Sequence, residues 1–150
     1  MISTMDSPQL EFAFAIRLWF TRTSMVPDIP TGGWRSAVYV DGGEIDGPRM
    51  KGRAVPNSGG DYAHFRPDDT AVFDARYMLE TDAGAHVEVW SRGLRVASPE
   101  VMARMAAGEA VAASAYYMRT AMRFDTAAPD LQWLVQRLCI GIGERRPDRD

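Results

Sequence analysis

Tyr117 and Arg119 are the residues whose types and spacing most clearly suggest chemistry. They lie two positions apart in the strand-like segment AYYMRT (115–120), so their side chains should point the same way. A phenol and a guanidinium can stabilise negative charge that develops on an enolate or phenolate oxygen without a metal. In the alternative interpretation, Arg119 pairs with a buried carboxylate and the tyrosine fills core, because ion pairs are often structural.

Asp61 is the candidate proton acceptor. It follows the glycine-rich corner Gly59-Gly60, at the expected rim of a barrel. Burial beside an apolar substrate would raise the pKa of its carboxyl into a range useful for acid-base catalysis. An aspartate at such a corner also commonly forms an Asx turn. Glu88 is the second carboxyl considered, but its expected neighbours are charged, which favours a solvated position.

A further set of residues is predicted to bind substrate. Its members are Arg49, Tyr77, Ser91 and Trp133. Tyr77 and Ser91 lie on the apolar side of an expected hairpin, where they would face a ligand. Arg49, like Arg76, could hold an oxyanion or could make a structural contact instead.

Signals for a metal or a cofactor are weak in this sequence. Asp61 precedes His64 by three positions, but no third clear ligand accompanies them, and catalytic metal sites usually take three ligands from protein. Gly141-Ile142-Gly143 lacks the later glycine and the following helix of a dinucleotide fingerprint. We therefore expect neither a metal nor a cofactor. A Gly-x-Ser-x-Gly elbow is also missing, which disfavours a hydrolase or lactonase.

Alternating strands separated by glycine and proline predict a mainly β protein, an antiparallel β-barrel with one short α-helix. Alternation from Glu11 to Phe20 predicts the first strand, and Asp41-Gly42-Gly43 predicts a tight reversal. The helix is expected over about Ser98 to Ala107, because serine can cap it and proline suits its first position. The segment from Leu131 to Gly143 also resembles a strand.

The clearest local unit is a hairpin from Ala71 to Arg92. If its turn centres on Ala83, three cross-strand pairs follow on one side of the hairpin. These pairs are Asp74 with Arg92, Arg76 with Trp90, and Glu80 with His86. The other side would then carry the apolar set Phe73, Ala75, Tyr77, Leu79, Val87 and Val89, together with Ser91. A slip of one residue would exchange the two faces, and the matched charges argue against it.

Composition bounds the class of protein. A chain of 150 residues with 46% hydrophobic residues is expected to fold as one domain, 1–150, alone or as a homodimer or higher homo-oligomer. A net charge of −3 without a basic run argues against nucleic acid as a partner. The single Cys139, the acidic residues near the N-terminus and the lack of a long apolar stretch favour a cytoplasmic protein with no membrane partner.

Several stretches carry a family resemblance across nearly the whole chain. They are GGEIDGPRMKG (42–52), GGDY and RPDD (59–69), FDARYMLETDAGA (73–85), RGLR (92–95), SPEVMARMAAGEAV (98–111), YYMRT (116–120) and RFDTAAPDLQWL (123–134). In order and spacing the chain resembles the family called domain of unknown function 3237, or uncharacterised protein family 0311. The resemblance implies a small β-barrel similar to the allene oxide cyclase and dirigent type. Ser91 and Val135 stand where relatives often have asparagine.

Relatives in that family are in a few cases associated with ring-closing steps on phenolic or polyketide-like molecules. Together with the candidate residues, this resemblance leads to the hypothesis of a cofactor-independent cyclase or isomerase. It would act by acid-base catalysis on a hydrophobic, oxygenated small molecule bound in the barrel. The alternative is a non-catalytic carrier or sensor. An enzyme should gather Asp61, Tyr117 and Arg119 around one cavity, whereas a carrier should have a nearly apolar lumen.

Overall fold

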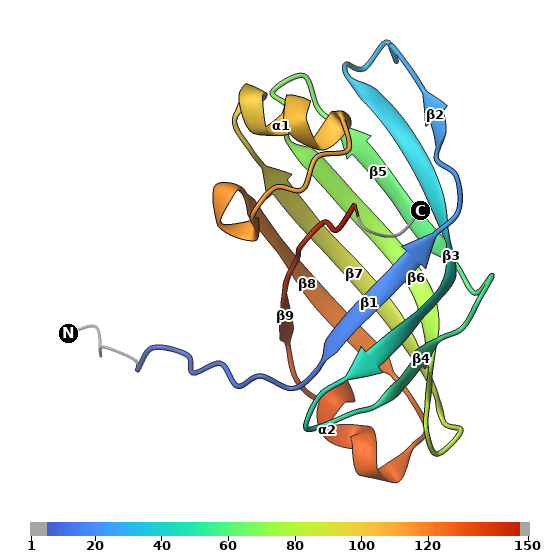
Figure 1. Cartoon of the computed structure of the whole chain (residues 1–150). Helices are drawn as coiled ribbons and strands as arrows, with labels where there is room; N and C mark the ends of the chain where they lie inside the picture. The colour runs from blue at the N-terminus through green and yellow to red at the C-terminus, as the bar shows by residue number, and fades with distance from the viewer. Residues whose placement is uncertain (1–5, 148–150) are drawn as a thin grey trace.

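The computed structural model describes residues 6–147, which form one nine-stranded sheet with two short α-helices (Figure 1). The strands are β1 (Ala15–Phe20), β2 (Ser24–Val26), β3 (Trp34–Asp46), β4 (Gly52–Ala54), β5 (Gly60–Phe65), β6 (Ala71–Thr81), β7 (His86–Val96), β8 (Tyr117–Asp125) and β9 (Cys139–Ile142). The helices are α1 (Pro99–Ala106) and α2 (Gln132–Val135), with 3₁₀ turns η1 (Ala113–Ala115) and η2 (Pro129–Leu131).

The sheet is antiparallel and curls into a barrel-like shape. Its strand order is β1-β3-β4-β6-β7-β8-β9, while β2 pairs with β3, and β5 lies between β3 and β6. β1 and β9 end this order, and within residues 6–147 no ladder joins them, so a seam remains between them. Helix α1 lies at one end of the curled sheet and α2 at the other (Figure 1). The prediction of a mainly β, barrel-type fold is confirmed.

The hairpin of β6 and β7 has the predicted register. Asp74 lies opposite Arg92, with 3.2 Å between Oδ1 and Nε, and the Arg76 guanidinium lies 5.0 Å from the Trp90 ring. Gly84 takes a positive φ of 86° in the turn, a conformation that glycine adopts without strain. These contacts confirm that the matched charges lie on the outer side of the hairpin.

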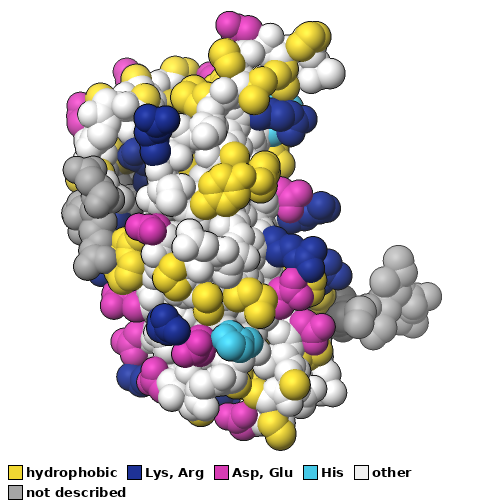
Figure 2. All heavy atoms as spheres, turned by 90° about the vertical axis from the view of Figure 1, so that its right-hand side faces the viewer, with side chains coloured by type: hydrophobic (Ala, Val, Ile, Leu, Met, Phe, Trp, Pro, Cys, Tyr) yellow, Lys and Arg dark blue, Asp and Glu magenta, His cyan; other side chains and the backbone are white. Residues whose placement is uncertain are grey.

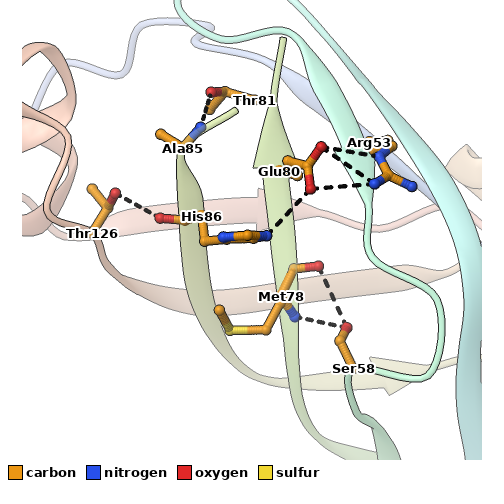
Figure 3. Close-up of polar contacts among 8 residues, drawn as sticks. All are labelled: Arg53, Ser58, Met78, Glu80, Thr81, Ala85, His86 and Thr126. Atoms are coloured by element: carbon orange, nitrogen blue, oxygen red, sulfur yellow. Dashed lines mark hydrogen bonds and ion pairs between the residues drawn. The ribbon is translucent and has the colours of Figure 1, made fainter. Parts of the chain in front are cut away.

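The third predicted pair, Glu80 with His86, belongs to a polar cluster near the hairpin turn (Figure 3). The Glu80 carboxylate lies 3.2 Å from His86 Nε2 and 3.2 Å from the Arg53 guanidinium on β4. Close by, Thr81 Oγ1 accepts a hydrogen bond from the Ala85 amide at 3.1 Å. Basic and acidic side chains are also interleaved on the face shown in Figure 2. Many charged side chains on the outer surface are therefore paired with one another.

Two predicted elements near the N-terminus are wrong in their bounds. β1 begins at Ala15 rather than Glu11, and β3 runs straight through Asp41-Gly42-Gly43 instead of reversing there. The register against β1 shifts by one residue at this point, so Asp41 is bulged. A Cβ on Gly43 would lie 2.2 Å from the Arg17 carbonyl oxygen. The glycines thus permit close approach of β1, and they do not form a turn.

The C-terminal prediction needs a similar correction. Residues 132–135 form α2, and the strand predicted from Leu131 to Gly143 is reduced to Cys139–Ile142. Leu131 and Leu134 are both buried, and their spacing of three suits one face of a helix better than a strand. The structure therefore has a second helix beyond the one predicted. α1 itself is confirmed, with Ser98 Oγ accepting a hydrogen bond from the Val101 amide.

Two apolar clusters occupy the two ends of the barrel. The larger includes Val40, Leu79, Val87, Val89, Phe124 and Leu134, and α2 closes its end. The smaller, with Met105, Val111 and Tyr116, packs α1 and the following turn against the opposite end. Between the two clusters lie the inward side chains that form the candidate site. None of the helices within residues 6–147 has the length and apolar character to cross a membrane.

Candidate functional site

The inner side of the sheet carries a group of polar side chains toward the α1 end. We call this group the lumenal cluster, and its members are Ser36, Asp61, Tyr77, Ser91, Arg95 and Thr120. Each has the same strand parity as a buried core residue on its own strand, which places its side chain on the inner side. Ser36, Asp61 and Thr120 keep part of their surface accessible to water.

The registers of β5, β6 and β7 bring Asp61 and Ser91 into one row. Asp61 lies opposite Ala75 on β6, and Ala75 lies opposite Ser91 on β7. All three side chains point inward, so only a methyl group stands between the carboxylate and the hydroxyl. The side chain at the centre of the row is therefore the shortest that a chiral residue can have.

Asp61 is a half-buried carboxyl. Burial raises the pKa of its carboxyl, and the nearby Asp74 carboxylate raises it further. The Asp74 amide donates a hydrogen bond of 3.0 Å to Asp61 Oδ1, which opposes those effects. A carboxyl whose pKa is raised in this way holds a proton more readily than an exposed aspartate, which suits it to accept and return a proton.

Tyr77 lies two residues after Ala75 on the same face of β6. Its side chain is 4% exposed, and burial raises the pKa of its phenol, with a further rise from the Asp61 carboxylate. The phenol therefore remains protonated and can donate its proton in a hydrogen bond. No other residue of the described chain is hydrogen-bonded to its hydroxyl.

The remaining hydroxyls of the lumenal cluster are similarly unpaired. Ser36, Ser91 and Thr120 make no side-chain hydrogen bond to any other described residue. Buried or half-buried polar groups are normally hydrogen-bonded, so several such groups on one inner surface are unusual. Convergent polar groups in a mostly apolar surround are the common form of a small-molecule site.

A groove of about 410 Å³ on the outer side of β5 and β6 is an alternative location, but its polar groups are already paired. Tyr39 and Tyr62 share a hydrogen bond of 2.6 Å between their hydroxyls, and Arg76 lies 2.6 Å from Glu88. The groove is shallow and open to solvent. We therefore place the candidate site on the inner side of the sheet.

Tyr117 and Arg119 are not brought together with Asp61. On β8 they lie opposite Val96 and Leu94, which are exposed on the outer side, and Tyr117 itself is 52% exposed. The Arg119 guanidinium lies 5.2 Å from the Tyr117 ring, and its Nη1 donates a hydrogen bond to the Met118 carbonyl. The expectation that these residues surround one cavity with Asp61 is wrong, because both have the outward parity of β8.

Arg49 and Trp133 form a contact of their own at the α2 end. The Arg49 guanidinium stacks 4.1 Å from the centre of the Trp133 ring and lies 3.7 Å from the Glu11 carboxylate. Of the four residues predicted to bind substrate, Tyr77 and Ser91 belong to the lumenal cluster, while this pair lies apart from it. The geometry favours the structural interpretation of Arg49.

Three members of the lumenal cluster were missed by sequence reasoning: Ser36, Arg95 and Thr120. Strand parity could have found Arg95, because it continues the apolar side of the hairpin beyond Val87, Val89 and Ser91. For Thr120 the signal was ambiguous, since both faces of β8 carry apolar residues. The same parity shows Arg119 in phase with Arg123 and Asp125, which indicates an outward face.

These features define a class of protein: a small antiparallel β-barrel-like domain with an apolar cluster at each end and polar side chains on the inner surface toward the α1 end. Within that class, the chain belongs to the family described as "Protein of unknown function (DUF3237)", whose model matches residues 8–150. The family resemblance noted in the sequence is thereby confirmed.

Solved structures support this assignment. A conserved protein of unknown function from Rhodopseudomonas palustris is 33% identical, with a TM-score of 0.87 over 95% of this chain and 93% of that one. A β-barrel-like protein from Acinetobacter baumannii is 29% identical, with a TM-score of 0.69 over 87% and 88%. An enzyme from Penicillium herquei shares the fold at 23% identity, with a TM-score of 0.72 over 97% and 90%.

Proposed function

We propose that this protein binds a hydrophobic, oxygenated small molecule against the lumenal cluster and catalyses a proton transfer on it, as a cyclase or isomerase that needs no cofactor. The observation that carries the proposal is the inward row of Asp61, Ala75 and Ser91 beside Tyr77. It supplies a carboxyl with a raised pKa and two hydroxyls that are free to bind a ligand. That a neighbour of the same fold is an enzyme is consistent with this proposal.

In the proposed step, the Asp61 carboxylate removes a proton from the carbon next to a ligand carbonyl, which in a phenolic ligand is the carbonyl of its keto form. Negative charge then develops on the ligand oxygen, where Tyr77 and Ser91 can each donate a hydrogen bond. Return of the proton from Asp61 to another carbon, or attack of the resulting enolate on a second carbonyl carbon, completes an isomerisation or a ring closure. Asp61 accepts one proton and returns one, which can first exchange with solvent, so the enzyme ends unchanged.

The polar lumen favours an enzyme over a carrier. A carrier of a hydrophobic molecule needs a nearly apolar lumen, because unpaired polar groups cost free energy when an apolar ligand displaces water from them. Here the inner surface carries a carboxyl, a phenol and aliphatic hydroxyls. Those groups are better suited to stabilising charge during a reaction.

The proposal can be tested with 2-naphthol, a bicyclic phenol whose C1 proton exchanges through its keto form. Exchange with D₂O is followed by NMR in the presence of the wild-type protein, Asp61→Asn and Ala75→Phe. We expect wild type to accelerate C1 exchange, Asp61→Asn to slow it by about a hundredfold, and Ala75→Phe to abolish it by filling the row. Ala121→Phe, on the exposed outer side of β8, is the matched control and should keep wild-type exchange.

The outcomes separate the candidate functions. Binding of 2-naphthol that Ala75→Phe prevents, without accelerated exchange, would contradict catalysis and favour a carrier. Exchange that survives in Asp61→Asn would remove Asp61 as the base. Equal loss in Ala75→Phe and Ala121→Phe would contradict the placement of the site on the inner side of the sheet.

A further inference from the structure

Arg95 is a buried arginine without an acidic partner among residues 6–147. It lies on the inner face of β7 near the α1 end and is 9% exposed. Within residues 6–147 its guanidinium makes no ion pair, and its buried Nε atom has no hydrogen-bond partner. Its one described contact is the ring of Phe73, 5.6 Å away on β6. Arginine is rarely this buried unless it is paired.

A second guanidinium lies near Arg95 and adds to the positive charge. Burial lowers the pKa of Arg95, and the charge of Arg145 lowers it further, while Tyr116 opposes both effects. Arg145 follows β9, and its amide donates a hydrogen bond of 2.9 Å to Tyr116 Oη. Two guanidiniums close to one another, with no carboxylate of the described residues paired to either, are unfavourable for folding alone. Such an arrangement is favourable when both face an anion.

Small residues adjoin Arg95 on the inner face of β7, and one of them, Gly93, packs closely against β8. Ser91, Gly93 and Arg95 follow one another on the inner face of β7, and Thr120 lies opposite Gly93 on β8. Ser91 and Arg95 are four positions apart, which corresponds to about 13 Å along an extended strand. A ligand that contacts both residues must therefore be elongated along the strand.

We propose that the lumenal cluster takes an organic anion, and that Arg95 binds its carboxylate or an equivalent oxyanion. The proposal rests on the proposed function, since it assumes that a small molecule occupies the inner side of the sheet. The anionic group lies at the α1 end against Arg95, and the apolar body extends past Phe73 and Gly93 toward the row of Asp61 and Ser91. A guanidinium binds a carboxylate through two parallel hydrogen bonds, which also fixes the orientation of the ligand.

The test uses two probes of nearly equal shape, the anion 2-naphthoate and the neutral 2-naphthamide. Their dissociation constants are measured by isothermal titration calorimetry for wild type, Arg95→Met, Arg95→Lys and Arg92→Met. Arg92 lies on the outer face of the same strand, paired with Asp74, and serves as the control. We expect wild type and Arg92→Met to bind 2-naphthoate at least tenfold more tightly than 2-naphthamide. Arg95→Met should abolish that preference, and Arg95→Lys should retain part of it.

Failure of this inference can be told apart from failure of the proposed function. If 2-naphthamide binds, and Ala75→Phe prevents that binding, the inner side of the sheet is a small-molecule site. An undiminished preference for 2-naphthoate in Arg95→Met would then overturn the role of Arg95 alone. If neither probe binds wild type, or if Ala75→Phe leaves both affinities unchanged, the proposed function and the anion site are both contradicted.

Discussion

The inward side chains of β6 and β7 change in character between the α2 end and the α1 end of the barrel. At the α2 end they are Leu79, Val87 and Val89, each with no exposed surface. At the α1 end they shrink to Ala75, Ser91 and Gly93, followed by the cation Arg95. One pair of strands therefore builds a packed core at one end and a polar inner surface at the other.

Along the same hairpin, the residues at the α2 end stabilise the fold, whereas those at the α1 end are expected to bind a ligand. Close-packed aliphatic side chains at the α2 end supply the burial that stabilises the sheet. Unpaired polar groups at the α1 end reduce stability, because buried polar groups without partners cost free energy. A protein retains such groups when they bind something, so we expect the two ends to respond in opposite directions to substitution.

The largest effect is expected at the α2 end, for Leu79→Ala. Leu79 is fully buried in the larger core cluster, so removing its side chain leaves a cavity. We expect a loss of about 2–5 kcal/mol in the free energy of unfolding, measured by urea denaturation. Val38→Ala, on a partly exposed inward residue of the α1 half, should cost less than about 1 kcal/mol. Equal losses in the two variants would contradict the contrast between the halves.

Arg95→Met should produce the next largest change, in the opposite direction. Replacing an unpaired buried cation by an apolar side chain of similar length removes a desolvation cost, while the contact with Phe73 is lost. We expect a net gain of about 1–2 kcal/mol in the free energy of unfolding. A higher melting temperature combined with a lost preference for 2-naphthoate would indicate a functional residue. Destabilisation by Arg95→Met would show instead that Arg95 supports the fold.

Asp61→Asn should change the pH dependence of stability by a smaller amount. Burial raises the pKa of Asp61 in the folded protein, so the folded state holds this proton more tightly than the unfolded state. Its contribution is fully present below the ordinary aspartate pKa of about 3.9 and is lost as the pH rises through the raised folded value. Wild type should therefore lose stability relative to Asp61→Asn between pH 4 and neutral pH. Unfolding curves with parallel pH dependence would contradict a raised pKa.

The smallest effect is expected for Arg92→Met on the outer side. The pair of Arg92 with Asp74 is exposed on both partners, and exposed ion pairs contribute little. We expect a change below about 1 kcal/mol in the free energy of unfolding, and a still smaller change in high salt. A loss as large as that of Leu79→Ala would mean that the outer ion pairs, rather than the α2 core, hold the hairpin together.

The sequence predicted best those features in which two independent patterns agree. In the β6–β7 hairpin, alternation and charge matching gave the same register, and every predicted pair is present. At Gly42 and Gly43 the prediction of a turn rested on composition alone. Glycine also allows two strands to approach closely, and this second use is visible only when the neighbouring β1 is in place. On β8 either parity could have faced inward, so Tyr117 and Arg119 were assigned to the wrong side.

The candidate site could be predicted only in part, because independent sequence patterns agree for some of its residues and not for others. Asp61, Tyr77 and Ser91 were identified, but their assembly depends on the pairing of β5 with β6, which joins segments that carry no matching pattern of their own. Arg95 could have been found by extending the hairpin parity beyond Ser91. That no acid within residues 6–147 pairs with it is a property of the fold, since the sequence offers many acids that could have done so.

The accessibility of the two ends to a small reagent tests the central contrast most directly. In a Cys139→Ser background, Ser91→Cys and Val89→Cys place thiols two residues apart on the inner face of β7. We predict that a small methanethiosulfonate reagent modifies Ser91→Cys under native conditions, that 2-naphthamide slows this reaction, and that Val89→Cys reacts only on unfolding. Native-state protection of both thiols alike, or equal reactivity of both, would contradict the account.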